Sequence, residues 1–458
     1  MSSSKLKIHF IAIGGSAMHN LALELHNQGY QVSGSDDELF EPSKSRLTKA
    51  RILPPELGWF PEKITKDLDA VILGMHARAN NPELLKAQEL GIKIYSYPEY
   101  IYQQSVDKQR IVIAGSHGKT TITSMILHIL KFHNRKFDYM VGALLEGFDT
   151  MVKLTEDAPI IIIEGDEYLT SPLDRTPKFL HYHHHIGLIS GVAWDHINVY
   201  PTFDEYVKQF EIFADSTPKG GILIYSEQDD LATVICGKER EDVQRVEYKA
   251  LKNEIRDGQT YLTTEKGDVH LQIFGKHNMR NLAGAKAVCA KIGITDDMFY
   301  EAVKSFKGAS NRLEILEKGL NATVFKDFAH APSKLKATTN AVKKQFPDRE
   351  LIAVLELHTF SSLNKEFLSQ YRDTFKADIP VVFFDQHTIE HKKLAPITEE
   401  DVKASFNNSD LKVFTDSGRL KEFLLNNNWK NKNLLLMSSG NFGGINIEEV
   451  AKEVVTTK

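Results

Sequence analysis

The sequence predicts an α/β fold arranged as three tandem α/β domains. Short runs of apolar, β-branched residues recur along the chain, and several end in glycine or acidic residues that precede a stretch with helical spacing. Repeated strand–loop–helix units of this kind are typical of parallel sheets covered by helices. The chain has 458 residues, which is too long for one hydrophobic core. We expect boundaries that divide it into residues 1–106, 107–307 and 308–458.

Composition is that of an ordinary globular protein, with 42% apolar and 26% charged residues. The net charge of −5 gives no electrostatic reason to expect nucleic acid or an anionic membrane as a partner. No apolar run approaches the roughly 20 residues that span a bilayer, and the first residues lack the apolar segment of a signal peptide. Cys236 and Cys289 lie far apart, which supports neither a disulfide framework nor a zinc site. We therefore expect a cytoplasmic protein with no membrane insertion.

The most informative stretch is a strand–loop–helix unit over residues 111–132. Backbone N–H groups of such a loop, together with the helix N-terminus, attract phosphate. Lys119 adds a mobile positive charge, and Thr120 stands where these loops hold Mg²⁺. Ile113 replaces the first glycine of the full Walker pattern, but the flanking strand and helix favour a phosphate loop over an ordinary glycine turn. The predicted ATP site comprises Gly115, Ser116, His117, Gly118, Lys119, Thr120 and Thr121.

A second glycine loop follows the predicted strand at residues 8–13. Gly14, Gly15 and Ser16 open a helix, and Asp36 ends the next strand about twenty positions later. This layout is that of a Rossmann-like unit, in which backbone amides bind a diphosphate and a carboxylate binds a ribose or base. A later strand at 71–74 leads into a loop that carries His76 and Arg78.

The apolar run at 159–163 predicts a strand that delivers Glu164 at its C-terminal end. Parallel sheets place ligands at this end, and carboxylate oxygen suits a hard cation such as Mg²⁺. A solvated acidic turn is the alternative.

Residues 181–185 read His-Tyr-His-His-His. Alternating histidines on a strand can share a face and bind a metal. No cysteine or acidic residue is adjacent, so we favour a partly exposed strand over a metal site.

The last part of the chain carries further polar residues at element ends. His277, Asn278 and Asn281 open a helix, where such residues are caps or present polar edges to a purine. The third βα series contains Arg312, Asp327 and His330, and its strand at 351–355 delivers Glu356 and His358. A glycine turn over residues 438–444 follows the last strand and could approach a ligand.

Taken in order, these motifs resemble the Mur ligase family, the ATP-dependent ligases of peptidoglycan synthesis. Residues 8–18 with Gly-Ser-Asp at 34–36 resemble the UDP-muramoyl-binding domain of the family branch that adds L-alanine. The loop at 115–121 is similar to the family's short G-T-x-G-K-T-T loop, which explains the missing Walker glycine. Glu164-Gly-Asp-Glu, Asp195-His196, His277-Asn278 with Asn281, Asn311-Arg312-Leu-Glu and Asp327-Phe-Ala-His330 follow in the family's order.

The resemblance implies a fold, a reaction and a set of roles. The domains would be a UDP-binding Rossmann-like domain, a central P-loop ATPase-type domain and a C-terminal Rossmann-like domain for an amino acid or peptide. ATP would activate the carboxyl group of UDP-N-acetylmuramate as an acyl phosphate, which an amine then attacks. The implied catalytic residues are Lys119, His196, Arg312 and His330, with Mg²⁺ held by Thr120, Glu164 and His196.

The remaining implied contacts are to nucleotides. His277, Asn278 and Asn281 would frame the adenine of ATP, Asp327 its ribose and Arg312 its γ-phosphate. Gly14, Gly15, Ser16 and Asp36 would hold the UDP moiety, with His76 and Arg78 as further candidates. Because Lys119 and Arg312 lie on different predicted domains, we expect the active site to form on domain closure.

Within the family, the sequence favours the branch that adds the tripeptide L-Ala-γ-D-Glu-meso-diaminopimelate during peptidoglycan recycling. Residues 174–182 resemble an insertion of that branch, as do residues 327–330 and 437–445. Leu-Glu-Leu-His at 355–358 resembles instead the branch that adds L-alanine, which is the alternative activity. Gly191 and Ala193 depart from the family pattern. We expect a monomer or weak homodimer.

Two functions of other classes remain as alternatives. An NAD-dependent oxidoreductase could be built on the first glycine loop, but it leaves the ATP loop and Glu164 without a role. A nucleotide-binding regulator without turnover is the other alternative, and Gly191 and Ala193 make it conceivable.

Overall fold

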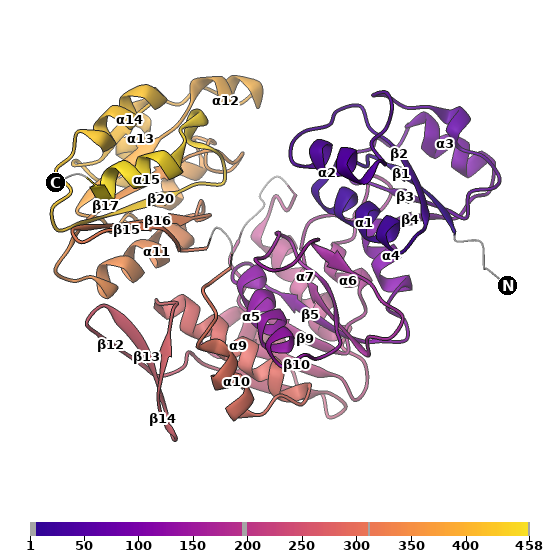
Figure 1. Cartoon of the computed structure of the whole chain (residues 1–458), viewed down its shortest axis with the longest axis horizontal. Coiled ribbons are helices and arrows are strands. Elements are labelled where there is room, and N and C mark those ends of the chain that lie inside the picture. The colour runs from indigo at the N-terminus through magenta and orange to yellow at the C-terminus, as the bar shows by residue number, and fades with distance from the viewer. Residues whose placement is uncertain (1–5, 195–198, 310–311, 457–458) are drawn as a thin grey trace. The chain divides into compact units, whose positions relative to one another are not determined.

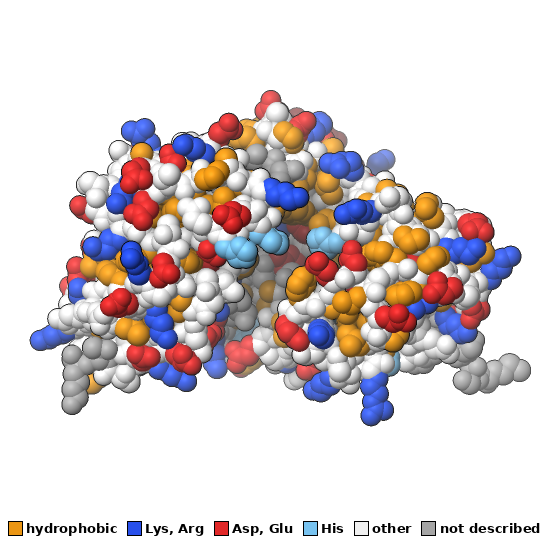
Figure 2. Space-filling model, turned by 90° about the horizontal axis from the view of Figure 1, so that it is seen from above, with side chains coloured by type: hydrophobic (Ala, Val, Ile, Leu, Met, Phe, Trp, Pro, Cys, Tyr) orange, Lys and Arg blue, Asp and Glu red, His pale blue; other side chains and the backbone are white. Residues whose placement is uncertain are grey.

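A computed structural model describes residues 6–194, 199–309 and 312–456. The described chain forms two compact units, the first from residues 6–194, 202–249 and 284–299 and the second from 199–201, 250–283, 300–309 and 312–456 (Figure 1). No helix within these described ranges has the length and apolar content needed to cross a membrane. Lys, Arg, Asp and Glu side chains are interspersed over the face shown in Figure 2, as the small net charge of the sequence leads one to expect.

The first unit begins with a parallel four-stranded sheet in the order β2-β1-β3-β4. Its core strand β1 pairs with both β2 and β3, and four of its five residues are buried. The short, apolar β3 is buried throughout, as expected of a parallel strand that is covered on both faces. The strands are β1 (Lys7–Ile11), β2 (Gln31–Ser35), β3 (Ala70–Leu73) and β4 (Ile94–Ser96), and the helices α1 (Ser16–Asn27), α2 (Ser43–Ala50), η1 (Pro61–Lys63), α3 (Pro82–Glu89) and α4 (Tyr97–Gln103).

A seven-stranded sheet follows in the same unit, in the order β11-β10-β9-β5-β8-β6-β7. All pairs are parallel except β6 with β7. Its strands are β5 (Gln109–Ala114), β6 (Asp138–Met140), β7 (Val152–Lys153), β8 (Ile160–Glu164), β9 (Ile186–Ile189), β10 (Ile222–Ser226) and β11 (Gln244–Tyr248). Its helices are α5 (Lys119–Phe132), α6 (Lys178–His181), α7 (Phe203–Asp215) and α8 (Asp230–Cys236), and α9 (Lys276–Lys291) and α10 (Asp296–Val303) come later in the chain.

The histidine-rich stretch at 181–185 corrects one expectation. These residues form the end of α6 and a turn before β9, rather than a partly exposed strand. His183 has a φ of +44°, which breaks an extended chain. The imidazole of His184 is buried, stacks on Phe213 with ring centroids 4.1 Å apart and contacts the Thr217 hydroxyl at 2.9 Å. No cluster of three His, Cys, Asp or Glu side chains suited to a metal occurs among the described residues.

The second unit contains two sheets. A three-stranded antiparallel sheet is formed by β12 (Asn253–Arg256), β13 (Gln259–Thr264) and β14 (Gly267–Leu271). A six-stranded sheet has the order β15-β16-β20-β17-β18-β19, in which only the β15–β16 pair is antiparallel. Its strands are β15 (Glu314–Lys318), β16 (Ala322–Asp327), β17 (Glu350–Glu356), β18 (Ile379–Phe383), β19 (Lys412–Phe414) and β20 (Lys432–Met437).

Alternate residues of β17 enter two separate cores, one on each face of the six-stranded sheet. Ala353 and Leu355 pack in one core, and Ile352 and Val354 pack in the other. This is the period of two expected of a strand buried on both faces. The covering elements are α11 (Pro332–Gln345), η2 (Phe367–Tyr371), α12 (Gln386–His391), α13 (Glu399–Phe406), α14 (Ser417–Leu425), η3 (Phe442–Gly444) and α15 (Ile447–Thr456). The predicted α/β class with helix-covered parallel sheets is confirmed, while the exact domain boundaries stay a prediction.

Candidate active site

The glycine loop joins the central strand β5 to helix α5. Gly115 has a φ of +124°, and a Cβ atom there would lie 2.2 Å from the Ser190 hydroxyl oxygen. Gly118 has a φ of +82° and caps the N-terminus of α5. Both positions therefore need glycine, because a side chain is strained in the left-handed region and has no room at Gly115. The loop ends with Lys119 in the first turn of α5, at the carboxyl edge of the sheet.

Lys119 is held by two oxygen atoms. Its ammonium group donates to the Gly115 carbonyl at 2.6 Å and to Glu167 Oε2 at 2.6 Å. Burial works to lower the pKa of Lys119, but the carboxylates of Glu167, Asp166 and Glu164 outweigh it and raise the pKa above its ordinary value. Lys119 is therefore a cation fixed beside the loop.

Two residues that sequence reasoning did not single out support this lysine. Glu167 is fully buried, and its other carboxylate oxygen accepts a hydrogen bond at 3.3 Å from the Tyr206 hydroxyl on α7. Tyr206 also contacts the Ser116 hydroxyl at 2.8 Å. Glu167 belongs to the Glu-Gly-Asp-Glu motif described above, so the sequence did contain an indication of its role. Tyr206 lies in an ordinary amphipathic helix and had none.

Thr120 and Glu164 form a pair of oxygen ligands beside Lys119. The Thr120 hydroxyl donates to Glu164 Oε1 at 2.6 Å, and the Gly142 N–H donates to Oε2 at 2.7 Å. Both side chains are nearly buried. A hydroxyl and a carboxylate are the donors that Mg²⁺ prefers, so this pair fits the predicted cation. His196, the third predicted ligand, lies outside the described residues.

The departures at Gly191 and Ala193 have a structural role. The Gly191 carbonyl accepts from the Ser116 N–H at 2.9 Å, and the Ala193 N–H donates to the Ser116 hydroxyl at 2.8 Å. A Cβ atom at Gly191 would lie 2.7 Å from Asp229 Oδ2. The segment therefore braces the glycine loop through backbone groups, and Asp229 occupies the space that a side chain at Gly191 would need.

The first glycine loop is organised by Asp36. Asp36 Oδ2 accepts from the Gly14 N–H at 2.6 Å, and a Cβ atom at Gly14 would lie 2.8 Å from that oxygen. Burial raises the pKa of Asp36, although the hydrogen bonds from Gly14 and Glu38 oppose the shift. The carboxylate thus contacts the loop itself in this structure. Gly15 lies next to this contact, and Ser16, His76 and Arg78 are exposed.

Arg46 on α2 is a cation near this loop that sequence reasoning missed. Its guanidinium donates to Asn20 Oδ1 at 2.8 Å and to the Asp149 carbonyl at 2.7 Å, and it lies 3.3 Å from His19 Nε2. His19 Nδ1 lies 2.9 Å from the Gly15 carbonyl. Burial lowers the pKa of His19. The contact with the Gly15 carbonyl opposes this shift, and the positive charge of Arg46 adds to it. Only the fold brings α2 to the start of α1, so no sequence pattern marked Arg46.

The predicted adenine residues open α9. Asn278 is buried and donates from Nδ2 to the Phe274 carbonyl at 2.9 Å, which is a helix-start contact. Burial, with a smaller effect of Arg280, lowers the pKa of His277 to about 4, so its imidazole is neutral at pH 7. Asn281 is half-buried one turn further along. The three residues share the first turns of one helix.

Arg312, Asp327 and His330 lie together in the second unit. The Arg312 guanidinium stands 4.7 Å above the Phe328 ring, and His330 Nδ1 lies 2.8 Å from the Phe328 carbonyl. Burial raises the pKa of Asp327, opposed by the charge of Arg312 and by the Ala329 N–H at 2.8 Å. The approach of this group to Lys119 stays a prediction.

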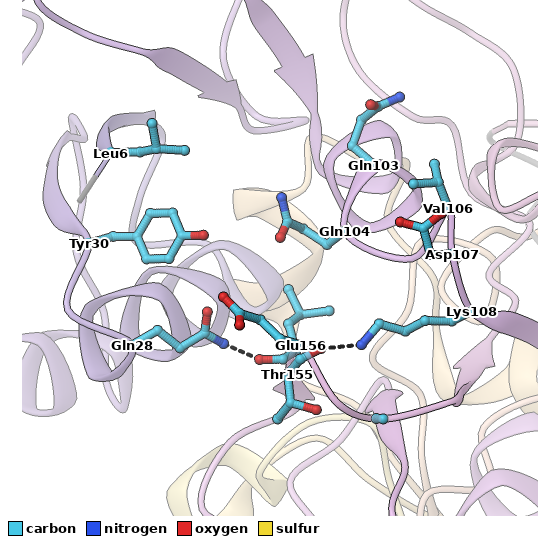
Figure 3. A pocket seen from close by; sticks show the side chains of 12 residues that line it. Leu6, Gln28, Tyr30, Gln103, Gln104, Val106, Asp107, Lys108, Thr155 and Glu156 are labelled. Carbon is cyan, nitrogen blue, oxygen red and sulfur yellow. Dashed lines mark hydrogen bonds between the residues drawn. The ribbon is translucent and has the colours of Figure 1, made fainter. Parts of the chain in front are cut away.

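A cavity of about 990 Å³ lies away from both glycine loops (Figure 3). Gln28 and Lys108 border it and donate to the Leu154 and Thr155 carbonyls. Its walls come from the C-terminal end of α1, the segment after α4 and the approach to β8, at the amino ends of the strands. Ligands in parallel α/β sheets bind at the carboxyl ends, so this cavity is not the candidate active site.

Two parts of the chain match models of one protein family. Residues 7–108 match the family described as "Mur ligase family, catalytic domain", and residues 113–289 match "Mur ligase middle domain". A UDP-N-acetylmuramate–L-alanine ligase of Sulfurihydrogenibium sp. (strain YO3AOP1) is 32% identical, over 82% of this chain and 81% of its own.

Two solved structures share the fold over nearly the whole chain. One is a murein peptide ligase from Psychrobacter arcticus 273-4, with 21% identity, a TM-score of 0.65 and coverage of 98% of this chain and 99% of that chain. The other is the UDP-N-acetylmuramate-alanine ligase from Thermotoga maritima, with 19% identity, a TM-score of 0.70 and coverage of 98% of each chain. On the sequence match to its relative and the two family matches, this chain belongs to the Mur ligase family.

Proposed function

We propose that this chain joins the carboxyl group of UDP-N-acetylmuramate to the amino group of L-alanine. Members of the Mur ligase family are ATP-dependent amide ligases of peptidoglycan synthesis, so the class of reaction follows from family membership. The observation that carries the choice of substrates is the relative at 32% identity, which is named a UDP-N-acetylmuramate–L-alanine ligase. This revises the preference for a tripeptide drawn from the sequence.

The chemistry requires an activated carboxyl group. A carboxylate does not condense with an amine in water because its oxygen is a poor leaving group. Transfer of the γ-phosphoryl group of ATP makes that oxygen part of a phosphate, which the amine can displace. The work of the protein is then positioning and charge stabilisation.

Lys119 is the proposed cation for the transferred phosphoryl group. The ammonium group is already desolvated and held at the glycine loop by Gly115 and Glu167. The loop residues from Gly115 to Thr121 would surround the phosphates with backbone N–H groups at the start of α5. Thr120 and Glu164, with His196, would hold Mg²⁺, which neutralises phosphate charge when bound.

The other contacts are proposed from the family resemblance. Gly14, Gly15 and Ser16 would bind the diphosphate of the UDP moiety, and Asp36 would shape this loop. His76 and Arg78, which follow β3, would be further contacts to UDP. His277, Asn278 and Asn281 would frame adenine, whose polar edges suit an amide and a neutral imidazole. Arg312 would meet the γ-phosphate of ATP, Asp327 would contact its ribose, and His330 would lie near the transferred group.

The tripeptide remains a second candidate for the amine because of residues 174–182. This segment is built into the first unit, since Phe179 packs on Phe210 with ring centroids 5.5 Å apart and Asp174 pairs with His181 at 2.8 Å. Lys178 pairs with Asp166 at 2.7 Å, two residues after Glu164. Residues 174–182 resemble an insertion of the tripeptide-adding branch and lie close to the proposed ligands of the cation. This position is the feature that favours the tripeptide as substrate.

One assay separates the two substrates. Phosphate release is measured with ATP, Mg²⁺ and UDP-N-acetylmuramate, adding either L-alanine or L-Ala-γ-D-Glu-meso-diaminopimelate. The proposal expects turnover with L-alanine and a much lower kcat/KM with the tripeptide. The reverse preference would assign the tripeptide activity, and no phosphate release with either amine would reject ligation of this sugar acid.

A further inference from the structure

The connection between β6 and β7, residues 141–151, contacts both of the proposed nucleotide-binding loops. We call it the β6–β7 loop. Its two strands pair in antiparallel fashion, and the Val141 N–H donates to the Met151 carbonyl at 2.9 Å, so the two ends of the loop lie side by side. The β6–β7 loop and both glycine loops belong to the first unit.

The N-terminal end of the β6–β7 loop contacts Glu164, a proposed ligand of Mg²⁺. The Gly142 N–H donates to Glu164 Oε2 at 2.7 Å, while the Thr120 hydroxyl donates to Oε1 at 2.6 Å. A Cβ atom at Gly142 would lie 3.1 Å from Glu164 Oε1, so the loop backbone packs directly on the carboxylate. A Glu164 carboxylate that is fixed by a bound cation would therefore fix this end of the loop as well.

The C-terminal end of the β6–β7 loop contacts the start of α1, where the first glycine loop ends. Asn20 is fully buried, and its Oδ1 accepts from the Met151 N–H at 3.0 Å. Its Nδ2 donates to the Ser16 carbonyl at 2.8 Å and contacts Met151 Sδ at 3.2 Å. The Ser16 hydroxyl also contacts Met151 Sδ, at 3.6 Å. One amide group therefore joins the β6–β7 loop to the last residue of the first glycine loop.

Arg46 holds the amide of Asn20 in this orientation. Its guanidinium donates to Asn20 Oδ1 at 2.8 Å and to the Asp149 carbonyl at 2.7 Å. Because a guanidinium only donates, it binds the amide oxygen and leaves the amide nitrogen to the Ser16 carbonyl. The position thus needs a side chain that both donates and accepts, which a carboxylate cannot do.

We propose that Asn20 is a positioning residue that couples the two glycine loops through the β6–β7 loop. The inference rests on the proposed function, in which UDP-N-acetylmuramate binds at Ser16 and ATP with Mg²⁺ binds at Thr120 and Glu164. Either ligand restricts the motion of the β6–β7 loop, so the second ligand meets a loop that is already ordered. Its binding then costs less conformational entropy, and each ligand raises the affinity for the other.

The test is the equilibrium binding of UDP-N-acetylmuramate with and without saturating Mg²⁺ and β,γ-imido-ATP, a non-hydrolysable analogue of ATP. In the wild type the analogue should lower the Kd of UDP-N-acetylmuramate about fivefold or more, as is typical of coupled sites. In the full-length Asn20→Asp variant the ratio of the two Kd values should fall to within about twofold of one. The aspartate keeps the size of the side chain and the acceptor for Met151, but it cannot donate to Ser16.

The comparison has an internal and an external control. A direct effect of the new charge on the binding of UDP-N-acetylmuramate alters both Kd values and cancels in their ratio. Asn27→Asp makes the same change at the exposed C-terminal end of α1 and should keep the wild-type ratio.

Hydrogen–deuterium exchange gives a readout that does not depend on activity. In the wild type, UDP-N-acetylmuramate alone should slow exchange in peptides that cover residues 141–151, because it orders the loop from the side of Asn20. In Asn20→Asp this protection should disappear. Mg²⁺ with β,γ-imido-ATP should still slow exchange in the variant, because the Gly142 contact with Glu164 is unchanged.

The outcomes that overturn the inference are distinct from failure of the proposed function. A wild-type ratio of one would show that the two sites are independent, and equal ratios in the wild type and Asn20→Asp would show that the amide does not couple them. If Asn20→Asp does not fold, Met151→Leu decides, since it keeps the volume and removes the sulfur that Ser16 and Asn20 contact. Its ratio should lie between those values, and a wild-type ratio would overturn the inference. Absence of UDP-N-acetylmuramate binding to the wild type would instead reject the proposed function.

Discussion

The ammonium nitrogen of Lys119 lies 2.6 Å from Oε2 of Glu167, a carboxylate with no solvent exposure. Lys119 is itself largely buried, so the loop carries a fixed cation whose charge is balanced inside the protein. A phosphate bound at the loop would meet a positive charge already in place. This preorganisation avoids the cost of desolvating and orienting the lysine at the moment of transfer.

Replacing Lys119 with alanine should lower turnover by at least the roughly 10²–10³-fold typical of losing one group that stabilises transition-state charge. The measurement is ATP-dependent phosphate release with saturating substrates. Lys136→Ala is the matched control, because Lys136 pairs with Asp157 on an exposed surface. Near-normal turnover of the Lys119 variant would refute the role of this lysine.

Replacing Tyr206 with phenylalanine should lower kcat moderately while the protein stays folded. The change removes the hydroxyl that contacts Ser116 at 2.8 Å and Glu167 at 3.3 Å, and it keeps the buried ring. The expected loss of stability is about 1 kcal/mol, the usual contribution of one hydrogen bond. Thermal unfolding and phosphate release measured together would test this, and a kcat equal to that of the wild type would show that the hydroxyl does not support Lys119.

Replacing Glu164 with glutamine should raise the Mg²⁺ concentration needed for half-maximal activity by about tenfold or more, as expected on losing a charged ligand. The single amide oxygen keeps one of the two hydrogen bonds, from the Thr120 hydroxyl or from the Gly142 N–H, so the fold should persist. Titration of activity with Mg²⁺ gives the readout, and Glu156→Gln at the surface is the control. An unchanged Mg²⁺ dependence would exclude Glu164 as a ligand.

Replacing Gly14 with alanine should destabilise the first glycine loop. The new Cβ would lie 2.6 Å from Leu39 Cδ2 and 2.8 Å from Asp36 Oδ2. Overpacking of this kind costs about 1–3 kcal/mol. Gly15→Ala is the comparison for stability, since its nearest neighbour would be 3.5 Å away. Thermal unfolding should show a lower Tm for the Gly14 variant alone, and equal values would contradict the crowding described here.

Acidification should destabilise the protein through His184. Burial lowers the pKa of His184 to about 3, whereas an unfolded histidine titrates near 6.5. Between these values the unfolded chain binds a proton that the folded chain does not, so stability is lost as the pH falls below 6.5. The loss by pH 5 is about 2 kcal/mol. Tm measured at pH 7 and pH 5 should fall less in His184→Gln than in the wild type or in His391→Gln, and equal falls would contradict the prediction.

Local patterns were sufficient for the strand–loop–helix units. The apolar runs before Gly115 and Gly14 are strands, and Glu164 lies at the end of a strand beside Thr120. These features were predictable because they depend on residues that are neighbours in the sequence. The prediction of a strand over the histidine-rich stretch at 181–185 was wrong, because the conformation of this stretch depends on residues far away in the sequence. His184 is placed by Phe213 and Thr217, which are about thirty residues away along the chain and leave no trace in its local pattern.

The amino-acid sequence by itself determined the class of fold, the glycine loop before Lys119 and the family. These depend on short-range spacing, on residues that must be glycine or lysine for steric or electrostatic reasons, and on the order of the motifs. Only the tertiary structure decided that Glu167 and Tyr206 brace the lysine and that Arg46 stands at the first glycine loop. Those contacts join segments far apart in the chain, and the packing of helices on the sheets brings them to the same edge.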